Sequence, residues 1–279
     1  MTLPAAVTQA LRCSVCGEPV ELAGRAVRCA RRHSFDLAKQ GYVNMLHARV
    51  PAGTADTTEM VAARVEFLAA GYYSELADLV AGQVATAGTG LVVDAGAGTG
   101  YHLARVLDRL PTATGLALDV SAVALRRAAK AHERLGAVTW NLWEPWPVAS
   151  GSASVLLNVF APRNGPEFRR VLRPDGLLVV VSPLAGHLRE LASVVDLLGV
   201  DGRKDERLDD RLGGQFEPLG RQEAVRRVTL PPDDVRRAVL MGPSAHHPRR
   251  LRRLDQVAEA IEVTTAFLIS VYRPRRLAK

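Results

Sequence analysis

A glycine-rich turn near the middle of the chain constrains the fold more than any other feature. The apolar run 91–94 ends in an acid, and a helix is predicted to begin near residue 101. Between them come Gly96, Gly98 and Gly100. Such a turn between a strand and a helix N-terminus lets the backbone pass close to a ligand, with its amides pointing at it. The pattern predicts an α/β fold that binds a ligand at the carboxyl end of this strand.

The spacing of the glycines and the nearby acids indicate the class of ligand. A dinucleotide turn needs Gly-x-Gly-x-x-Gly to seat a pyrophosphate, whereas Tyr101 stands where the last of these glycines would be. A second strand over 115–119 ends in Asp119, 25 residues after Asp94. A carboxylate there can accept both ribose hydroxyls and repels a ribose phosphate. These features favour a phosphate-free nucleoside, and together with the order of strand, turn and helix they predict an S-adenosylmethionine-dependent methyltransferase.

Further apolar runs complete the predicted sheet. We expect five more strands, at 138–142, 153–160, 176–182, 225–230 and 261–272. A turn at Arg173–Asp175 should precede the third of these five. Seven strands with intervening helices predict a doubly wound, Rossmann-like class I methyltransferase sheet. Two helices broken at Gly71 are expected between Thr58 and Ala87, because apolar residues there return at helical spacing.

Several side chains fall at the predicted ligand-binding edge by topology, because ligands bind at the carboxyl ends of strands in such sheets. They include Asn158 and the segment 182–187. Asn141 either accepts a hydrogen bond from an adenine amino group, with Leu142 packed on the ring, or is an ordinary polar strand end. Tyr73 is either a wall of the cofactor pocket or an ordinary aromatic.

The N-terminal segment carries a metal-binding pattern. All three cysteines of the chain, Cys13, Cys16 and Cys29, lie close to His33, with the spacing Cys-x2-Cys-x12-Cys-x3-His. A Cys-x2-Cys turn places two thiolates on one side of a tight loop, as tetrahedral Zn²⁺ requires. Three cysteines cannot all form disulfides, and a cytoplasmic chain keeps its thiols reduced. We therefore predict structural zinc, with a short hairpin between the ligand pairs over 20–28.

Composition narrows the class of partner. The formal net charge is +7, with 48% hydrophobic and 23% charged residues. Clustered Arg and Lys favour a polyanion such as RNA, although a plain basic surface is the alternative. No apolar run approaches the roughly 20 residues of a membrane helix, and residues 1–6 lack the pattern of a secretory signal. We expect a cytoplasmic protein with no membrane span.

A family resemblance rests on seven parts of the chain. They are the zinc pattern, the Gly-Tyr-Val-Asn block at 41–44, the glycine turn, and the segments Asp56–Arg64, Gly71–Tyr73, Phe160–Asn164 and Met241–Ser244. Over essentially the whole chain, the sequence resembles the 23S rRNA (guanine-N1)-methyltransferases that have an N-terminal zinc finger. Asp56–Arg64 and the run Asn-Val-Phe-Ala-Pro-Arg-Asn are most similar to the macrolide-resistance branch, typified by the tylosin-resistance enzyme.

The resemblance implies a division of the chain and a set of site residues. Residues 1–48 would form a zinc-binding RNA-recognition domain, 49–88 a linker with helices, and 89–279 the methyltransferase domain. Together, the turn, the topology and the resemblance give the cofactor set Tyr73, Asp94, Gly96, Gly98, Thr99, Gly100, Asp119, Asn141, Leu142 and His187. Asn141 departs from the branch, which carries Asp there.

The resemblance also implies a reaction. The chain would methylate N1 of guanine 748 in the domain II hairpin of 23S rRNA, near the peptide exit tunnel, and confer macrolide resistance. The alternatives are the same chemistry at guanine 745, a small-molecule methyltransferase of antibiotic biosynthesis, or a zinc RNA-binding protein with a decayed cofactor fold. Guanine N1 must lose a proton, for which His187, Asn158 and Arg163 are the candidate catalytic groups. A homodimer is also expected, because it would bind one hairpin with two zinc modules.

Overall fold

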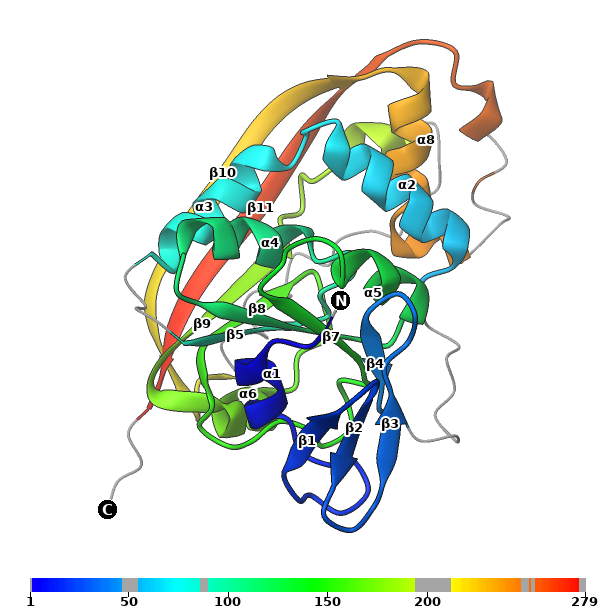
Figure 1. Ribbon diagram of the computed structural model, residues 1–279. Coiled ribbons are helices and arrows are strands. Elements are labelled where there is room, and N and C mark those ends of the chain that lie inside the picture. The colour runs from blue at the N-terminus through cyan, green and yellow to red at the C-terminus, as the bar shows by residue number, and fades with distance from the viewer. Residues whose placement is uncertain are drawn as a thin grey trace.

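The computed structural model describes residues 2–46, 55–85, 90–193, 212–246, 251 and 254–275. Its centre is a mixed sheet of eight strands in the order β10-β11-β9-β8-β5-β6-β7-β4 (Figure 1). The strands are β4 (Tyr42–Asn44), β5 (Leu91–Ala95), β6 (Thr114–Asp119), β7 (Leu135–Thr139), β8 (Ala153–Val159), β9 (Leu172–Pro183), β10 (Phe216–Leu230) and β11 (Ile261–Pro274). The strands from β4 to β9 run parallel, and β11 and β10 are antiparallel additions at one edge.

Helices cover both faces of this sheet, as a doubly wound fold requires. They are α1 (Ala5–Ala10), α2 (Thr58–Ala69), α3 (Ser74–Gln83), α4 (Tyr101–Arg109), α5 (Ala122–Ala128), α6 (Gly165–Val171) and α8 (Pro232–Leu240), with 3-10 turns η1 (Arg189–Ser193), η2 (Pro243–His246) and η4 (Leu254–Gln256). One apolar core joins the sheet to α2, α3, α4, α5 and α8, and a second joins the opposite face to α1 and α6. The class I methyltransferase architecture predicted from the glycine turn is confirmed.

The predicted count of seven strands is wrong, because β4 adds an eighth. Its residues Tyr42 and Asn44 pair in parallel with Ala137 and Thr139 of β7. Val43 between them is fully buried in the second core. A strand of three residues is too short to show a periodic pattern, so no local signal marks it.

Several strand boundaries also differ from those predicted. β10 begins at Phe216, nine residues before the predicted start. The sequence does not mark this part, because the edge strand is largely exposed and Pro218, Gly220 and charged residues interrupt its apolar positions. β9 begins at Leu172 and takes in Arg173–Asp175, where we expected a turn. Its pairing with β8 is irregular there, because the register shifts between Leu172 and Leu177. β7 ends at Thr139, so Asn141 and Leu142 lie in the loop that follows it.

The N-terminal segment forms a small three-stranded sheet, hereafter the zinc ribbon, of β1 (Val20–Ala23), β2 (Ala26–Cys29) and β3 (Ser34–Asp36). The predicted hairpin over 20–28 is confirmed, and β3 extends it. The ribbon shares the second core with the main sheet. A division of the chain at residue 48 stays a prediction.

The two helices predicted before the glycine turn are present as α2 and α3. They are separated at Gly71, whose φ of 86° favours glycine. Residues 50–54 of the predicted linker and the predicted helix end at Ala87 lie outside the described residues. Within the part of the chain that the structure describes, no helix is long and apolar enough to cross a membrane.

Candidate active site and zinc centre

The glycine turn is folded tightly onto the ends of β5 and β6. The amides of Gly96 and Ala97 donate to the carbonyl of Leu118 at 2.8 and 3.1 Å. Gly96, Gly98 and Gly100 all have positive φ, which other residues rarely adopt. A Cβ at Gly96 would also collide with the side chain of Ala161. The turn therefore requires glycine for both its conformation and its closeness to the loop after β8.

Asp119 holds the turn in place from the end of β6. Its Oδ2 accepts from the Gly98 amide and its Oδ1 from the Ser121 amide, each at 2.8 Å. Burial raises the pKa of Asp119, and these two amide donors oppose that shift. A carboxylate offers about four lone-pair sites. Asp119 can therefore bind the turn and still accept hydroxyl donors from a ligand, as predicted for a ribose.

Asp94, at the end of β5, is the buried acid of the site. The residue is 2% exposed, and its Oδ1 has no hydrogen-bond partner among the described residues. Burial, and the charge of Asp119, raise the pKa of Asp94 to about 8. A buried polar atom without a partner is costly. A cationic or hydrogen-bond-donating ligand group beside Asp94 would relieve that cost, so the site fits the aminoacyl end of the predicted cofactor.

The raised pKa of Asp94 predicts a pH-dependent stability. Between about pH 4 and pH 8, Asp94 is protonated in the folded protein and ionised in the unfolded chain, so unfolding releases a proton. The free energy of unfolding of the ligand-free protein should therefore fall as pH rises, by up to about 1.4 kcal/mol per pH unit from this group. Asp94→Asn removes the contribution and should be the more stable protein near pH 8. Urea unfolding of both proteins at several pH values measures the difference. If the free energy of unfolding depended on pH equally in both proteins, the raised pKa of Asp94 would be wrong.

Tyr73 and His187, distant in sequence, meet at the site. The Tyr73 hydroxyl lies 3.1 Å from His187 Nε2, and His187 Nδ1 accepts from the Ala266 amide at 3.3 Å. Because Nδ1 is an acceptor, the neutral ring carries its proton on Nε2 and donates it to Tyr73. Burial lowers the pKa of His187 to about 4, so the ring is neutral at pH 7. His187 therefore has no free lone pair for a proton and positions Tyr73 in this arrangement.

The end of β8 and the loop after it hold the other two candidate catalytic residues, Asn158 and Arg163. Asn158 is fully buried, and its Nδ2 donates to the carbonyls of Ala95 and Pro162 at 3.1 and 2.9 Å. Its Oδ1 has no partner among the described residues and remains an acceptor. Arg163 donates to Ser182 Oγ at 2.9 Å. Asn158 thus lies against the start of the glycine turn, and the hydrogen bond to Ser182 holds Arg163 next to β9.

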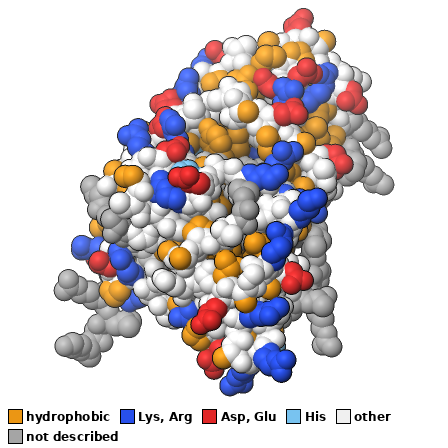
Figure 2. Space-filling view, in the orientation of Figure 1, with side chains coloured by type: hydrophobic (Ala, Val, Ile, Leu, Met, Phe, Trp, Pro, Cys, Tyr) orange, Lys and Arg blue, Asp and Glu red, His pale blue; other side chains and the backbone are white. Residues whose placement is uncertain are grey.

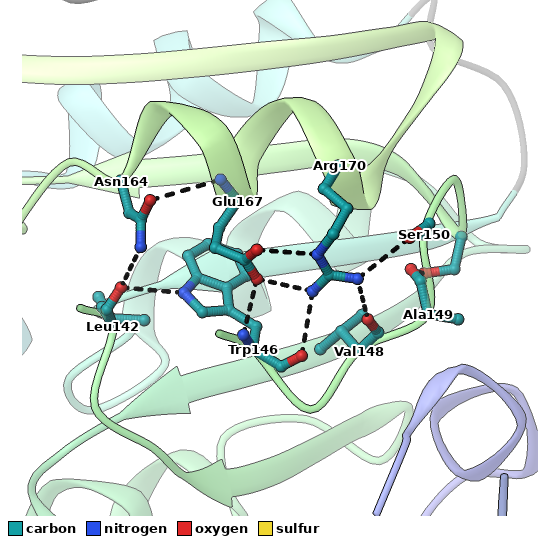
Figure 3. A network of polar contacts seen from close by, with 9 residues as sticks. Leu142, Trp146, Val148, Ala149, Ser150, Asn164, Glu167 and Arg170 are labelled. Carbon is teal, nitrogen blue, oxygen red and sulfur yellow. Dashed lines mark hydrogen bonds and ion pairs between the residues drawn. The ribbon is translucent and has the colours of Figure 1, made fainter. Parts of the chain in front are cut away.

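The loop after β7 is fixed by a polar network that local sequence patterns do not reveal (Figure 3). Glu167 of α6 accepts from the Trp146 amide and from Arg170, both at 2.6 Å. Arg170 also donates to the carbonyls of Trp146 and Val148. The Leu142 carbonyl accepts from Trp146 Nε1 and from Asn164 Nδ2, at 3.0 and 2.9 Å. These bonds hold Leu142 beside Gly96.

Asn141 itself caps the turn that follows it, because its Oδ1 accepts from the Trp143 amide at 3.1 Å. The second lone pair of that oxygen is available to a ligand. Its role as an adenine contact therefore stays a prediction, and so does that of Leu142, which is buried beside Gly96.

Loss of Arg170 should loosen this loop. Arg170→Ala removes the donors to two carbonyls and leaves the mostly buried Glu167 carboxylate without its ion pair. We expect a loss of about 2–4 kcal/mol in the free energy of unfolding. The neighbouring Arg169→Ala is the control, since Arg169 makes an exposed bond to the Arg275 carbonyl. Urea unfolding measures both, and equal losses would argue against the network.

A second contact that sequence spacing does not predict braces the turn from the other side. Arg64 of α2 forms an ion pair with Asp56 and donates to the Met241 carbonyl at 2.7 Å. A Cβ on Gly98 would lie 3.3 Å from Arg64 Nη1. The Ser121 hydroxyl donates to the Asp56 carbonyl at 3.2 Å. The charged guanidinium of Arg64 thus lies against the glycine turn.

The four predicted zinc ligands converge. The ligand atoms of Cys13, Cys16, Cys29 and His33 all lie within 4.8 Å of one another. Cys16 and Cys29 have their sulfurs 3.7 Å apart, close to the edge of about 3.8 Å that a tetrahedron with 2.3 Å zinc–sulfur bonds requires. His33 faces the sulfurs of Cys13 and Cys29 with Nδ1, at 3.5 and 3.4 Å. All three cysteines are free thiols, and the donor set fits structural zinc.

Comparisons with known proteins agree with this architecture. The family model described as "RlmA, N-terminal", a zinc ribbon, matches residues 11–50. A protein of Micromonospora griseorubida named as a 23S rRNA (guanine-N(1)-)-methyltransferase is 52% identical over 95% of this chain and 97% of its own length. The 23S rRNA (guanine(748)-N(1))-methyltransferase of Streptomyces fradiae is 44% identical over 96% of this chain and 98% of its own length. The chain belongs to the family of 23S rRNA (guanine-N1)-methyltransferases.

Proposed function

We propose that this protein transfers a methyl group from S-adenosylmethionine to N1 of guanine 748 in 23S rRNA. The observation that carries the proposal is the full-length similarity to the Streptomyces fradiae enzyme of that specificity, at 44% identity. The site supports it, because the buried Asp94 and the turn-bound Asp119 suit a phosphate-free nucleoside that bears a positive charge. Guanine 745 is the alternative target.

The chain's residues have distinct tasks in this reaction. S-adenosylmethionine supplies an electrophilic methyl group on a sulfonium. Asp119 would hold the ribose, Asp94 the amino group, and Leu142 the adenine ring. Guanine N1 would lose its proton to water and form a bond to the methyl carbon, while the bond from that carbon to sulfur would break. Alignment of the three atoms is the main contribution of the protein.

The candidate catalytic residues would act on the acceptor guanine without taking its proton. Asn158 Oδ1 is a buried acceptor that can orient an N–H of the base. Arg163 would stabilise negative charge on the guanine oxygen as N1 loses its proton to water. His187 would act through Tyr73, as its hydrogen bonds indicate.

The zinc ribbon would provide the contact to RNA. Five exposed basic residues lie on or next to it: Arg25, Arg28, Arg31, Arg32 and Lys39. Figure 2 shows Lys and Arg side chains over the ribbon and across the same face of the larger domain. Such side chains bind phosphate and release counterions. We further propose a cytoplasmic protein that acts as a homodimer on the domain II hairpin and confers macrolide resistance.

In vitro methylation tests the proposal. The zinc-loaded protein is incubated with labelled S-adenosylmethionine and unmodified 23S rRNA, and the product is read by primer extension, which N1-methylguanine blocks. A stop at guanine 748, abolished in a transcript with adenine at that position, is the expected result. A stop at guanine 745 would select the alternative target, and no label in RNA would overturn the proposal.

A further inference from the structure

Phe160 has an unusual backbone conformation directly after β8. Its φ is 55°, a region that residues with a Cβ rarely adopt. Among the described residues only Arg32, Phe160 and Leu188 combine a side chain with a positive φ. The Phe160 amide still donates to the Val181 carbonyl at 3.2 Å. The conformation is therefore tied to the sheet edge, where strain of this kind often serves a site.

The positive φ changes the face of the sheet on which the ring lies. Side chains alternate along a strand, so residue 160 should share a face with Leu156, in the second core. Its ring instead lies with Tyr73 and Phe267, which belong to the first core, at centroid distances of 6.3 and 5.2 Å. The chain thus adopts an unfavourable conformation to bring an aromatic ring to the side of the glycine turn.

Packing does not account for this ring. Phe160 is 43% exposed, one of the few large hydrophobic side chains in the described part of the chain to be so open. The loop that carries it is firmly held, since Asn158 binds the Pro162 carbonyl and Ala161 lies against Gly96. A rigid, exposed aromatic ring beside a cofactor turn is a surface on which a planar ligand can stack.

Polar groups lie around the same ring. His102, at the start of α4, has its ring centroid 6.3 Å from that of Phe160, and its Nδ1 has no hydrogen-bond partner among the described residues. The Tyr73 hydroxyl, which accepts from His187, keeps its own proton to donate. An aromatic face with hydrogen-bonding groups near its edge suits a nucleobase better than an aliphatic ligand.

We propose that the Phe160 ring is the platform on which the acceptor guanine stacks after it leaves the RNA helix. This inference rests on the proposed function, because it assumes a guanine as substrate. A base inside a hairpin stem or stack must be extruded before its N1 can meet a methyl donor, and an aromatic surface offsets the lost stacking. Phe160 is then a substrate-binding residue, and the cofactor does not need its ring.

A double-mutant cycle tests the stacking directly. Full-length, zinc-loaded wild-type protein and the variants Phe160→Leu and Phe160→Tyr are titrated with two domain II hairpins, one with guanine and one with an abasic site at the target position. The wild type should bind the guanine hairpin about tenfold or more tightly than the abasic one. Phe160→Leu should lose most of that preference, whereas Phe160→Tyr should keep it. Equal preference in wild type and Phe160→Leu would overturn the proposal.

Two further measurements distinguish guanine stacking from a role of the ring in cofactor binding. Phe160→Leu should lower kcat/KM for hairpin methylation by about tenfold or more while the Kd for S-adenosylmethionine changes less than about twofold. A parallel loss of cofactor affinity would overturn the assignment to guanine. Phe160→Gly, which relieves the positive φ, is a second ringless variant in case the leucine variant folds poorly. Failure of the wild type to methylate the hairpin would reject the proposed function, whereas methylation with an additive cycle would reject only the role of Phe160.

Discussion

Replacing Cys29 by serine is expected to abolish zinc binding and to destabilise far more than the ribbon. The Cys29 sulfur lies 3.7 Å from that of Cys16 and 3.4 Å from His33 Nδ1, so its loss opens the ligand tetrahedron. Zinc binding supplies much of the folding free energy of so small a module. The ribbon shares its core with the main sheet, so unfolding should expose Leu156 and Phe168 as well. A loss of several kcal/mol should lower Tm by roughly 10 °C or more.

Metal analysis and thermal unfolding measure these effects. The wild type should contain about one zinc per chain and Cys29→Ser none, as four ligands are needed for a closed structural site. Ser34→Ala is the matched control, because Ser34 lies exposed on the same ribbon and accepts a hydrogen bond from Arg28. If Cys29→Ser kept its zinc or its Tm, the four-ligand site would be wrong.

Local sequence signals predicted those parts of the fold that depend on neighbours along the chain. The positive φ angles of the glycine turn are indicated by residues 96–100 alone, and the four zinc ligands are close together in the sequence. Apolar β-branched runs marked the buried strands β5 and β8. The strand β4 and the first half of β10 were not predicted, because β4 is three residues long and the exposed first half of β10 has no continuous apolar run.

The sequence and the resemblance name candidate site residues, but they do not predict the contacts between them. Tyr73 and His187 were both expected at the cofactor, yet the hydrogen bond between them joins residues 114 apart. The Ala266 amide that donates to His187 Nδ1 is another 79 residues along the chain. The hydrogen bond from Arg64 to the Met241 carbonyl depends on α2 lying against the segment after α8, far along the chain. The positive φ of Phe160 had no signal at all, because glycine or asparagine is the usual mark of that conformation. Side-chain partners that the tertiary fold brings together cannot be predicted from spacing.

Replacing Asp119 by alanine is expected to reduce the affinity for S-adenosylmethionine by at least about 100-fold. The substitution removes the acceptor of the Gly98 and Ser121 amides, each worth about 1–3 kcal/mol when left without a partner. The glycine turn then loses the side chain that holds it, and the proposed contact between the ribose and the Asp119 carboxylate is lost as well. A 100-fold loss corresponds to about 2.8 kcal/mol, which is within the sum of these effects. Isothermal titration calorimetry with the zinc-loaded protein measures it.

The matching control separates this geometry from a general change of charge. Asp108→Ala removes the same charge from an exposed position on α4, where Asp108 faces His132 at 3.7 Å, and should leave the affinity nearly unchanged. Asp119→Asn should fall between the two, because one amide oxygen can still accept while the NH₂ group opposes the second backbone donor. If Asp119→Ala bound the cofactor within about threefold of the wild type, the carboxylate would only support the fold, and the ribose contact would have to come from elsewhere on the turn.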